Sequence, residues 1–216
     1  AAAKAMPGVL AVLTGADLVA AGFGPIRPSV MFNNRDGTPM KVPPHPSLSI
    51  DRVRHVGDAV ACVIAETALQ ARDAAEAVAL DIDPLPAVTD ARAAAEPGAP
   101  QLHDGVPGNL VLDYHYGDSA KTEAAFAAAK HVVRLKLINN RLVANPIEPR
   151  AALAEYDASS GRWTFHTCSQ GVFGMRQTLA ADILGVAPDR LRVLTGNVGG
   201  SFGMKSAVYP EYACLL

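Results

Sequence analysis

The sequence predicts a mixed α/β (α+β) fold in two units, residues 1–92 and 118–216, joined by a linker at 93–117. In both units, short apolar runs of strand length alternate with helical segments that begin at cap residues. Between the units the chain is rich in turn formers, which is typical of an interdomain linker: Pro97, Gly98, Pro100, Gly105, Pro107 and Gly108. A length of 216 residues is sufficient for two small domains, each with its own core.

The first unit is expected to contain a small sheet and one main helix. Residues 9–13 form a β-like apolar run, and the turn at 14–17 provides helix-cap chemistry. Pro, Gly and paired Asn without a regular period predict a long loop at 23–46, of the kind that often forms a site or an interface. A strand pair at 53–65, a helix at 67–77 with Thr67 as its N-cap and a strand at 78–82 complete the prediction for this unit.

The second unit is expected to begin with an Ala-rich helix that is capped near Asp118 and runs to Lys130. Residues 131–138 alternate apolar and polar side chains, which predicts a half-buried strand. A turn sequence between 151–156 and 162–167 predicts a hairpin. A helix at 172–184 should end at Gly185, and a strand at 191–194 should lead into a glycine-rich loop at 195–203.

Charge and composition exclude several classes of protein. Lys and Arg number 19 against 21 Asp and Glu, a net charge of -2, whereas a general nucleic-acid binder would carry a basic stripe. No apolar run is long enough to span a membrane. Cys62, Cys168 and Cys214 are odd in number and far apart, which is not a disulfide framework, so a reducing compartment is favoured and we expect a cytoplasmic protein.

No local motif predicts a metal held by side chains, because neither the Cys nor the His residues have ligand spacing. The glycine-rich loop is the sharpest candidate site, since its glycines allow positive φ and expose N–H groups to an anion or an oxo ligand. It is not a Walker loop, because Met204 stands between Gly203 and Lys205, and its spacing does not fit the dinucleotide fingerprint. A tight strand-to-helix turn without a ligand remains open.

Two further features have a functional and a structural interpretation. Gln170 lies between a predicted strand and a predicted helix, where an amide can hydrogen-bond a ligand, although an exposed Gln near a helix start would look the same. Glu148 and Arg150 lie between prolines, and the simpler interpretation is an ion pair that shapes a loop. No triad or paired-carboxylate arrangement can be proposed from the sequence.

Taken together, several segments resemble one family closely. They are similar to the molybdopterin-binding large subunit of the xanthine dehydrogenase and aldehyde oxidase family, and most of all to its aerobic carbon-monoxide-dehydrogenase-like members. The matching segments are residues 51–61, 84–88, 139–142, 145–150, 169–170 and 198–205. Each is short, but together they follow the family's order and approximate spacing over essentially the whole chain.

The resemblance implies an α/β hammerhead domain at 1–92 and the beginning of a molybdopterin-binding domain at 118–216. It implies that molybdenum is held by a pterin cofactor, in the cytosine dinucleotide form, and by no protein side chain. The residues that match the family's cofactor-binding positions are Gln170, Gly199, Gly200, Ser201, Phe202 and Gly203. Of these, Gln170 would hydrogen-bond an oxo ligand of the metal, and Phe202 would be the closest contact of the loop.

The implied reaction is oxidation of a small molecule (carbon monoxide, an aldehyde or an N-heterocycle) with oxygen derived from water. Electrons would leave through 2Fe-2S clusters on a small partner subunit to FAD on a medium partner subunit. The resemblance places the catalytic Glu downstream of residue 216 and none within this chain, so we expect a fragment that is inactive alone. The alternative is a non-catalytic module that docks partner subunits, with the 23–46 loop as its docking surface.

Two residues depart from the family pattern. Ser201 stands where a third Gly is usual, and its small side chain should be tolerated. Ser206 stands where xanthine-oxidising members have a Glu, which argues against a purine substrate.

Overall fold

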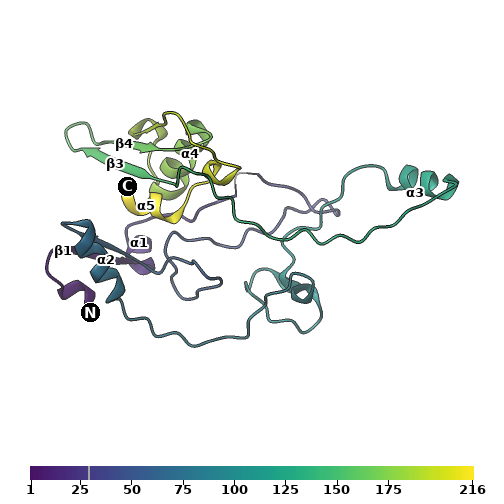
Figure 1. The fold of residues 1–216 in the computed structure, drawn as a ribbon, viewed down its shortest axis with the longest axis horizontal. Helices are drawn as coiled ribbons and strands as arrows, with labels where there is room; N and C mark the ends of the chain where they lie inside the picture. Colours follow the sequence, from purple (N-terminus) through teal and green to yellow (C-terminus); the bar gives the residue numbers. More distant parts are fainter. Residues whose placement is uncertain (29) are drawn as a thin grey trace.

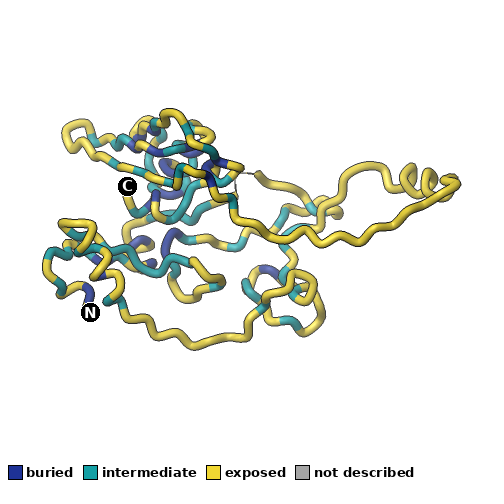
Figure 2. Tube along the Cα trace, in the orientation of Figure 1, coloured by how far each residue is buried: buried dark blue, intermediate teal, exposed yellow. Residues whose placement is uncertain are grey.

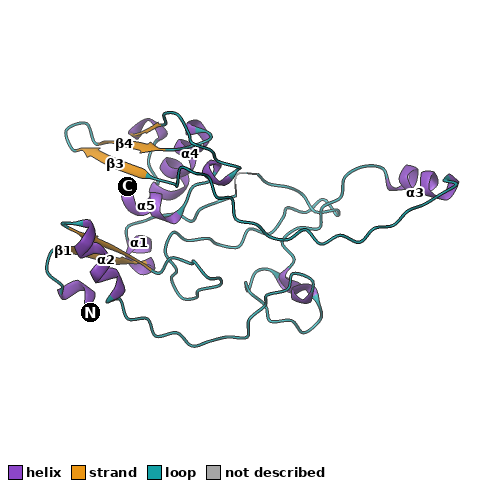
Figure 3. Cartoon of the chain, in the orientation of Figure 1, coloured by secondary structure: helices purple, strands orange, loops and turns teal. Residues whose placement is uncertain are grey.

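The computed structural model describes residues 1–28 and 30–216. Two small groups of helices and strands lie side by side, one holding β1, α1 and α2 and the other holding β3, β4, α4 and α5 (Figure 1). A long arm that carries α3 extends away from both groups, and Figure 3 shows that most of the chain between the groups is loop. The predicted α/β class is confirmed, since each group combines helices with a small sheet.

The first group is built on an antiparallel pair, β1 (Val9–Thr14) and β2 (Ala61–Ala65), which lie far apart in the sequence. A short 3-10 helix, η1 (Ala3–Ala5), precedes β1, and α1 (Gly15–Ala20) follows it directly. Thr14 and Asp17 form the capping box of α1, while the Thr67 hydroxyl caps α2 (Ala68–Glu76) by accepting from the Gln70 N–H. Both predicted cap positions are therefore confirmed.

The second group has a three-stranded sheet in the order β3-β4-β5. β3 (Ala152–Asp157) and β4 (Arg162–Thr167) form the predicted antiparallel hairpin, and β5 (Leu191–Leu194) lies parallel to β4. The predicted helix is α4 (Val172–Gln177) continued by the π-helical turn η4 (Thr178–Leu184). It ends at Gly185, whose φ of 66° is the left-handed cap that glycine favours. The helix α5 (Pro210–Leu215) is the last element.

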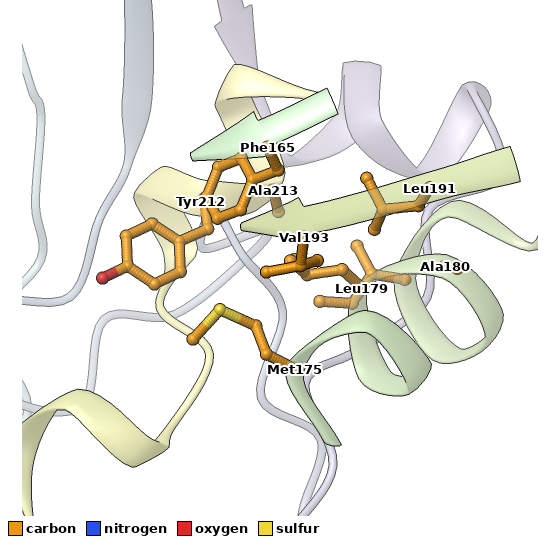
Figure 4. Packing of buried hydrophobic residues seen from close by; sticks show 9 residues of the cluster. Phe165, Met175, Leu179, Ala180, Leu191, Val193, Tyr212 and Ala213 are labelled. Atoms are coloured by element: carbon orange, nitrogen blue, oxygen red, sulfur yellow. The ribbon is translucent and has the colours of Figure 1, made fainter. Parts of the chain in front are cut away.

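One hydrophobic core holds the second group together. Phe165 of β4, Leu191 of β5 and Leu179 of η4 are at most 1% exposed and pack against one another with Met175, Ala180, Ile183, Val193, Tyr212 and Ala213 (Figure 4). Phe165 also meets the Tyr212 ring edge-on, with ring centroids 5.3 Å apart. The core therefore joins the sheet, the α4–η4 helix and α5 into one unit.

The arm is almost entirely exposed, as the yellow tube of Figure 2 shows. It carries α3 (Ser119–Ala128), whose N-cap is the predicted Asp118. The strands predicted at 78–82 and 131–138 are wrong, because neither segment pairs with another strand in the part of the chain that the structure describes. The strand pair at 53–65 is correct only for its second half, β2. The apolar–polar alternation of residues 131–138 is compatible with a strand. A strand also requires a neighbouring strand that accepts and donates its backbone hydrogen bonds, and the described residues provide none here.

The remaining elements are short 3-10 helices: η2 (Ala93–Ala95), η3 (Pro107–Asn109), η5 (Pro188–Arg190) and η6 (Met204–Ser206). Residues 23–28 and 30–46 form a long loop, as predicted, with an isolated bridge between Asn33 and Pro39. It links the two groups, because the Gly24 N–H donates to the Ile183 carbonyl at 2.8 Å. Among the described helices, none combines the length and the apolar character that crossing a bilayer requires.

Cys62 of β2 and Cys214 of α5 form a contact between the two groups. Both thiols line a cavity of about 1010 Å³. The neighbouring Cys214 thiol lowers the pKa of Cys62 to about 7, against the opposing effect of burial. Cys62 and burial together raise the pKa of Cys214, so Cys62 is the thiol of the pair that ionises first.

Alkylation of Cys62 by iodoacetamide is expected to follow the thiolate, with a midpoint near pH 7 instead of the roughly 8.5 of a free thiol. The rate should rise as pH increases through that midpoint, as measured by mass spectrometry of the Cys62 peptide. Cys214→Ala removes the neighbouring thiol and should move the midpoint upward. An unchanged midpoint in that variant would show that Cys214 does not set the reactivity of Cys62.

Candidate functional site

Parallel pairing of β4 and β5 brings the predicted site residues together. The two strands run in register from Trp163 opposite Leu191 to His166 opposite Leu194, so their carboxyl ends lie at the same edge of the sheet. Beyond the ladder, the Ser169 N–H donates to the Thr195 hydroxyl at 3.2 Å. Gln170, which follows β4, and the glycine-rich loop, which follows β5, are therefore neighbours.

The loop has an unusual backbone. Phe202 has a φ of 52°, a left-handed conformation that is uncommon for an aromatic residue, and it lies between Gly200 at 92° and Gly203 at 86°. The Phe202 side chain is 80% exposed. None of the N–H groups of residues 200–203 donates to an acceptor within residues 1–28 or 30–216. The loop thus presents a run of unused backbone donors beside an exposed aromatic ring.

Gln170 is joined to the loop by a closed set of hydrogen bonds. Its N–H donates to the Lys205 carbonyl at 3.1 Å, and the Lys205 N–H donates to the Ser201 hydroxyl oxygen at 3.0 Å. The Ser201 hydroxyl donates in turn to Gln170 Oε1 at 2.5 Å. Ser201 is buried, whereas Gln170 is exposed. This arrangement holds the amide of Gln170 next to the unused donors of the loop.

An ion pair between Glu148 and Lys205 holds the glycine-rich loop in place. Lys205 Nζ lies 2.6 Å from Glu148 Oε2, and the same oxygen accepts the Gly199 N–H at 2.8 Å. The hydrogen bonds from Lys205 and Gly199 lower the pKa of Glu148. Burial acts to lower the pKa of Lys205, but the hydrogen bond to Glu148 and the interaction with Cys168 outweigh it and raise the pKa. Both groups therefore stay charged around neutral pH.

Close packing explains why position 199 of the loop is a glycine. A Cβ on Gly199 would lie 2.7 Å from the Cβ of Glu148, which is closer than side chains approach one another. In contrast, a Cβ on Gly203 would meet nothing within 4 Å among the described residues. The loop is thus pressed against residues 146–148 at its start and open toward its end.

The expected pairing of Glu148 with Arg150 is wrong. Glu148 pairs with Lys205, and Arg150 instead lies 2.7 Å from Glu211 of α5 and stacks 3.6 Å from the Tyr209 ring centroid. In an extended segment, side chains two positions apart lie on the same side, so Glu148 and Arg150 could have paired. The fold instead brings Lys205 to Glu148 and Glu211 to Arg150. Glu148 and Lys205 are site residues that the sequence did not reveal, because they are 57 positions apart and no local pattern links them.

The arrangement can bind a ligand that accepts hydrogen bonds. No group of three or more His, Cys, Asp or Glu side chains that could hold a metal is formed within the described ranges. The cavity lined by Cys62 and Cys214 includes none of the predicted site residues. The chemistry available at the candidate site is therefore donation of hydrogen bonds from backbone N–H groups and from the amide of Gln170.

Two family models match the chain. The model of the molybdopterin cofactor-binding domain matches residues 102–216, and that of the aldehyde oxidase and xanthine dehydrogenase a/b hammerhead domain matches residues 1–86. The carbon monoxide dehydrogenase large chain of Hydrogenophaga pseudoflava is 31% identical over 235 residues, covering 100% of this chain and 27% of that protein. The nicotine 6-hydroxylase large subunit of Paenarthrobacter nicotinovorans is 32% identical, covering 97% of this chain and 25% of that protein.

Solved structures show the same relationship. Quinoline 2-oxidoreductase from Pseudomonas putida 86 has a TM-score of 0.85 and 30% identity, with 99% of this chain and 26% of that chain covered. The chain thus spans about a quarter of the length of the relatives it matches. With a hammerhead match followed by a molybdopterin-binding match, the chain belongs to the aldehyde oxidase and xanthine dehydrogenase family of molybdopterin-binding proteins.

Proposed function

We propose that this chain is part of the cofactor-binding large subunit of a molybdenum hydroxylase, and that its site at Gln170 and residues 199–203 faces the cofactor. The observation that carries the proposal is the juxtaposition of Gln170 with four unused backbone donors at one edge of the sheet. Relatives named as a carbon monoxide dehydrogenase, a nicotine 6-hydroxylase and a quinoline 2-oxidoreductase support the reaction class.

We propose that the cofactor is molybdopterin with molybdenum, in the cytosine dinucleotide form, and the hydrogen-bond donors of the site suit the molybdenum end of such a cofactor. The oxygens and sulfurs around such a metal are acceptors, and the N–H groups of residues 200–203 donate to no acceptor among the described residues. When bound, the cofactor supplies two-electron redox chemistry with oxygen derived from water. The protein supplies hydrogen bonds that are already oriented, which stabilise developing negative charge without any change in protonation.

Each site residue has a distinct part in this proposal. The amide of Gln170 donates to a ligand oxygen, and the N–H groups of residues 200–203 donate beside it. The exposed ring of Phe202 lies against the cofactor and limits access of water to that face. Glu148 and Lys205 hold the loop in place through the buried ammonium group.

The remaining steps belong to other parts of the protein. The proposed substrate is a small molecule such as carbon monoxide, an aldehyde or an N-heterocycle. Its catalytic glutamate lies beyond these 216 residues. Electrons would pass to 2Fe-2S clusters on a small partner subunit and to FAD on a medium one, in a complex that we expect to be cytoplasmic. Residues 1–92 form the hammerhead domain, 93–117 the linker and 118–216 the beginning of the molybdopterin-binding domain.

Metal analysis of the full-length protein, purified with the subunits that accompany it, is the direct test. Molybdenum is expected in stoichiometric amount with the large subunit, together with a pterin that is released on denaturation. A full-length protein that holds neither would refute the proposed function. That result would leave the alternative of a module that only docks other subunits.

A further inference from the structure

The Ser201 hydroxyl takes part in two hydrogen bonds that link the glycine-rich loop to Gln170. Ser201 is the buried member of the closed set of hydrogen bonds that joins Gln170 to Lys205, and its hydroxyl makes contacts in two directions. One contact is to the main chain of Lys205, in η6 just after the loop, and the other is to the side chain of Gln170, which belongs to the segment after β4. Ser201 therefore connects the two halves of the site.

The direction of these hydrogen bonds follows from the groups involved. A backbone N–H can only donate, so the Ser201 oxygen accepts from the Lys205 N–H at 3.0 Å. The single hydroxyl proton then remains for the second contact, and the acceptor at 2.5 Å is Gln170 Oε1. The carbonyl side of the Gln170 amide is thereby occupied.

The NH₂ side of the Gln170 amide is available to a ligand. Gln170 Nε2 donates to no acceptor within residues 1–28 or 30–216, and Gln170 is exposed. A glutamine amide that is not held rotates between two orientations of nearly equal energy and can present either an acceptor or a donor. With its carbonyl bound to Ser201, Gln170 presents only its NH₂ group.

We propose that Ser201 is a positioning residue that fixes the amide of Gln170 with its NH₂ group toward the ligand, so that the site selects a hydrogen-bond acceptor there. The inference rests on the proposed function for the identity of that ligand. The orientation itself depends only on residues of this chain. Ser201 does not touch the ligand in this account and acts through Gln170.

The first test is structural and uses the cofactor-free full-length protein. Crystal structures of the parent and of Ser201→Thr, which keeps the hydroxyl, are expected to show Gln170 in one orientation. In Ser201→Ala the Gln170 side chain should move away from residue 201 or occupy more than one orientation, because the hydrogen bond from the Ser201 hydroxyl is lost. A Gln170 that keeps its place in Ser201→Ala would overturn the proposal, whatever the activity of the protein.

The second test is a double-mutant cycle in the full-length protein assembled with its partner subunits. Ser201→Ala is expected to lower kcat about three- to tenfold with little change in KM, the effect of one hydrogen bond, and Ser201→Thr should restore it. In a Gln170→Ala background, Ser201→Ala should have no further effect. An equal loss in both backgrounds would assign Ser201 a merely structural role through the Lys205 N–H.

Failure of the wider proposal would look different. If the full-length protein holds no molybdenum, then the proposed function fails. If Gln170→Ala keeps parental turnover, only the assignment of Gln170 to the site fails. The orientation of Gln170 in the crystal structures would still decide whether Ser201 fixes it.

Discussion

Gln170→Ala is expected to lower turnover of the full-length enzyme by about 10²–10³-fold, the cost of removing one preorganised donor from a catalytic centre. The side chain is exposed and, among the described residues, takes part in a single hydrogen bond, which it accepts from Ser201. Its backbone N–H still donates to the Lys205 carbonyl in the variant. Folding and molybdenum content should therefore stay at parental levels while steady-state activity falls.

Gln170→Glu separates the donor from the bulk of the side chain. Glutamate has nearly the same shape and can still accept from the Ser201 hydroxyl, but its ionised carboxylate has no proton to donate. We expect Gln170→Glu to be as impaired as Gln170→Ala. Near-parental activity in the glutamate variant would mean that the side chain only fills space.

Gln177→Ala is the matched control, because Gln177 is an exposed glutamine on α4 in the same unit. Its replacement should leave turnover unchanged within error. If Gln170→Ala also kept parental turnover, Gln170 would not be part of the site. The comparison requires equal molybdenum content in all variants, so that the activity is expressed per loaded enzyme.

Local patterns predicted the elements whose stability is local. The hairpin of β3 and β4 follows from its turn sequence, and the helix that ends at Gly185 follows from its period and its cap. The cap residues Thr67 and Asp118 are correct for the same reason, since the bonds they form reach only a few positions along the chain.

Where a prediction failed, the missing information was a partner distant in the sequence. Residues 131–138 have the alternation of a strand, yet Val133 and Leu135 are 90% and 79% exposed and no ladder forms within the described residues. The pairing of Glu148 with Lys205 instead of Arg150 is another case, because ion pairs form wherever the fold brings opposite charges together. The parallel pairing of β4 with β5 also depends on the core beneath the sheet.

The grouping of Gln170 with residues 199–203 shows how the two kinds of information combine. Each segment stood out in the sequence alone, one as an amide between a strand and a helix and the other as a glycine-rich loop. Their proximity required the order of strands in the sheet. The hydrogen bonds that Ser201 makes to both segments could not be read from the sequence, since a serine near a glycine is common in turns.

Phe165→Ala is expected to lower the free energy of unfolding of the 216-residue chain by about 3–5 kcal/mol, because the ring is fully buried and its removal leaves a cavity. Denaturation by urea, followed by circular dichroism, measures the change. Phe126→Ala is the matched control, since Phe126 on the α3 arm is 60% exposed, and it should alter stability by less than about 0.5 kcal/mol. Equal losses in the two variants would contradict the core described for the second group.

The same core determines where the site lies, so the effect of Phe165 should extend beyond stability. Phe165 is on β4, which leads to Gln170, and it packs with Leu191 and Val193 of β5, which leads to the glycine-rich loop. Phe165→Leu keeps most of the buried volume and should cost less than about 1.5 kcal/mol. In the full-length enzyme the leucine variant should retain its molybdenum. The alanine variant should contain less molybdenum per large subunit, because the ends of β4 and β5 are no longer held together by a packed core. Retention of full molybdenum content by a destabilised Phe165→Ala enzyme would show that the site is held by contacts outside this core.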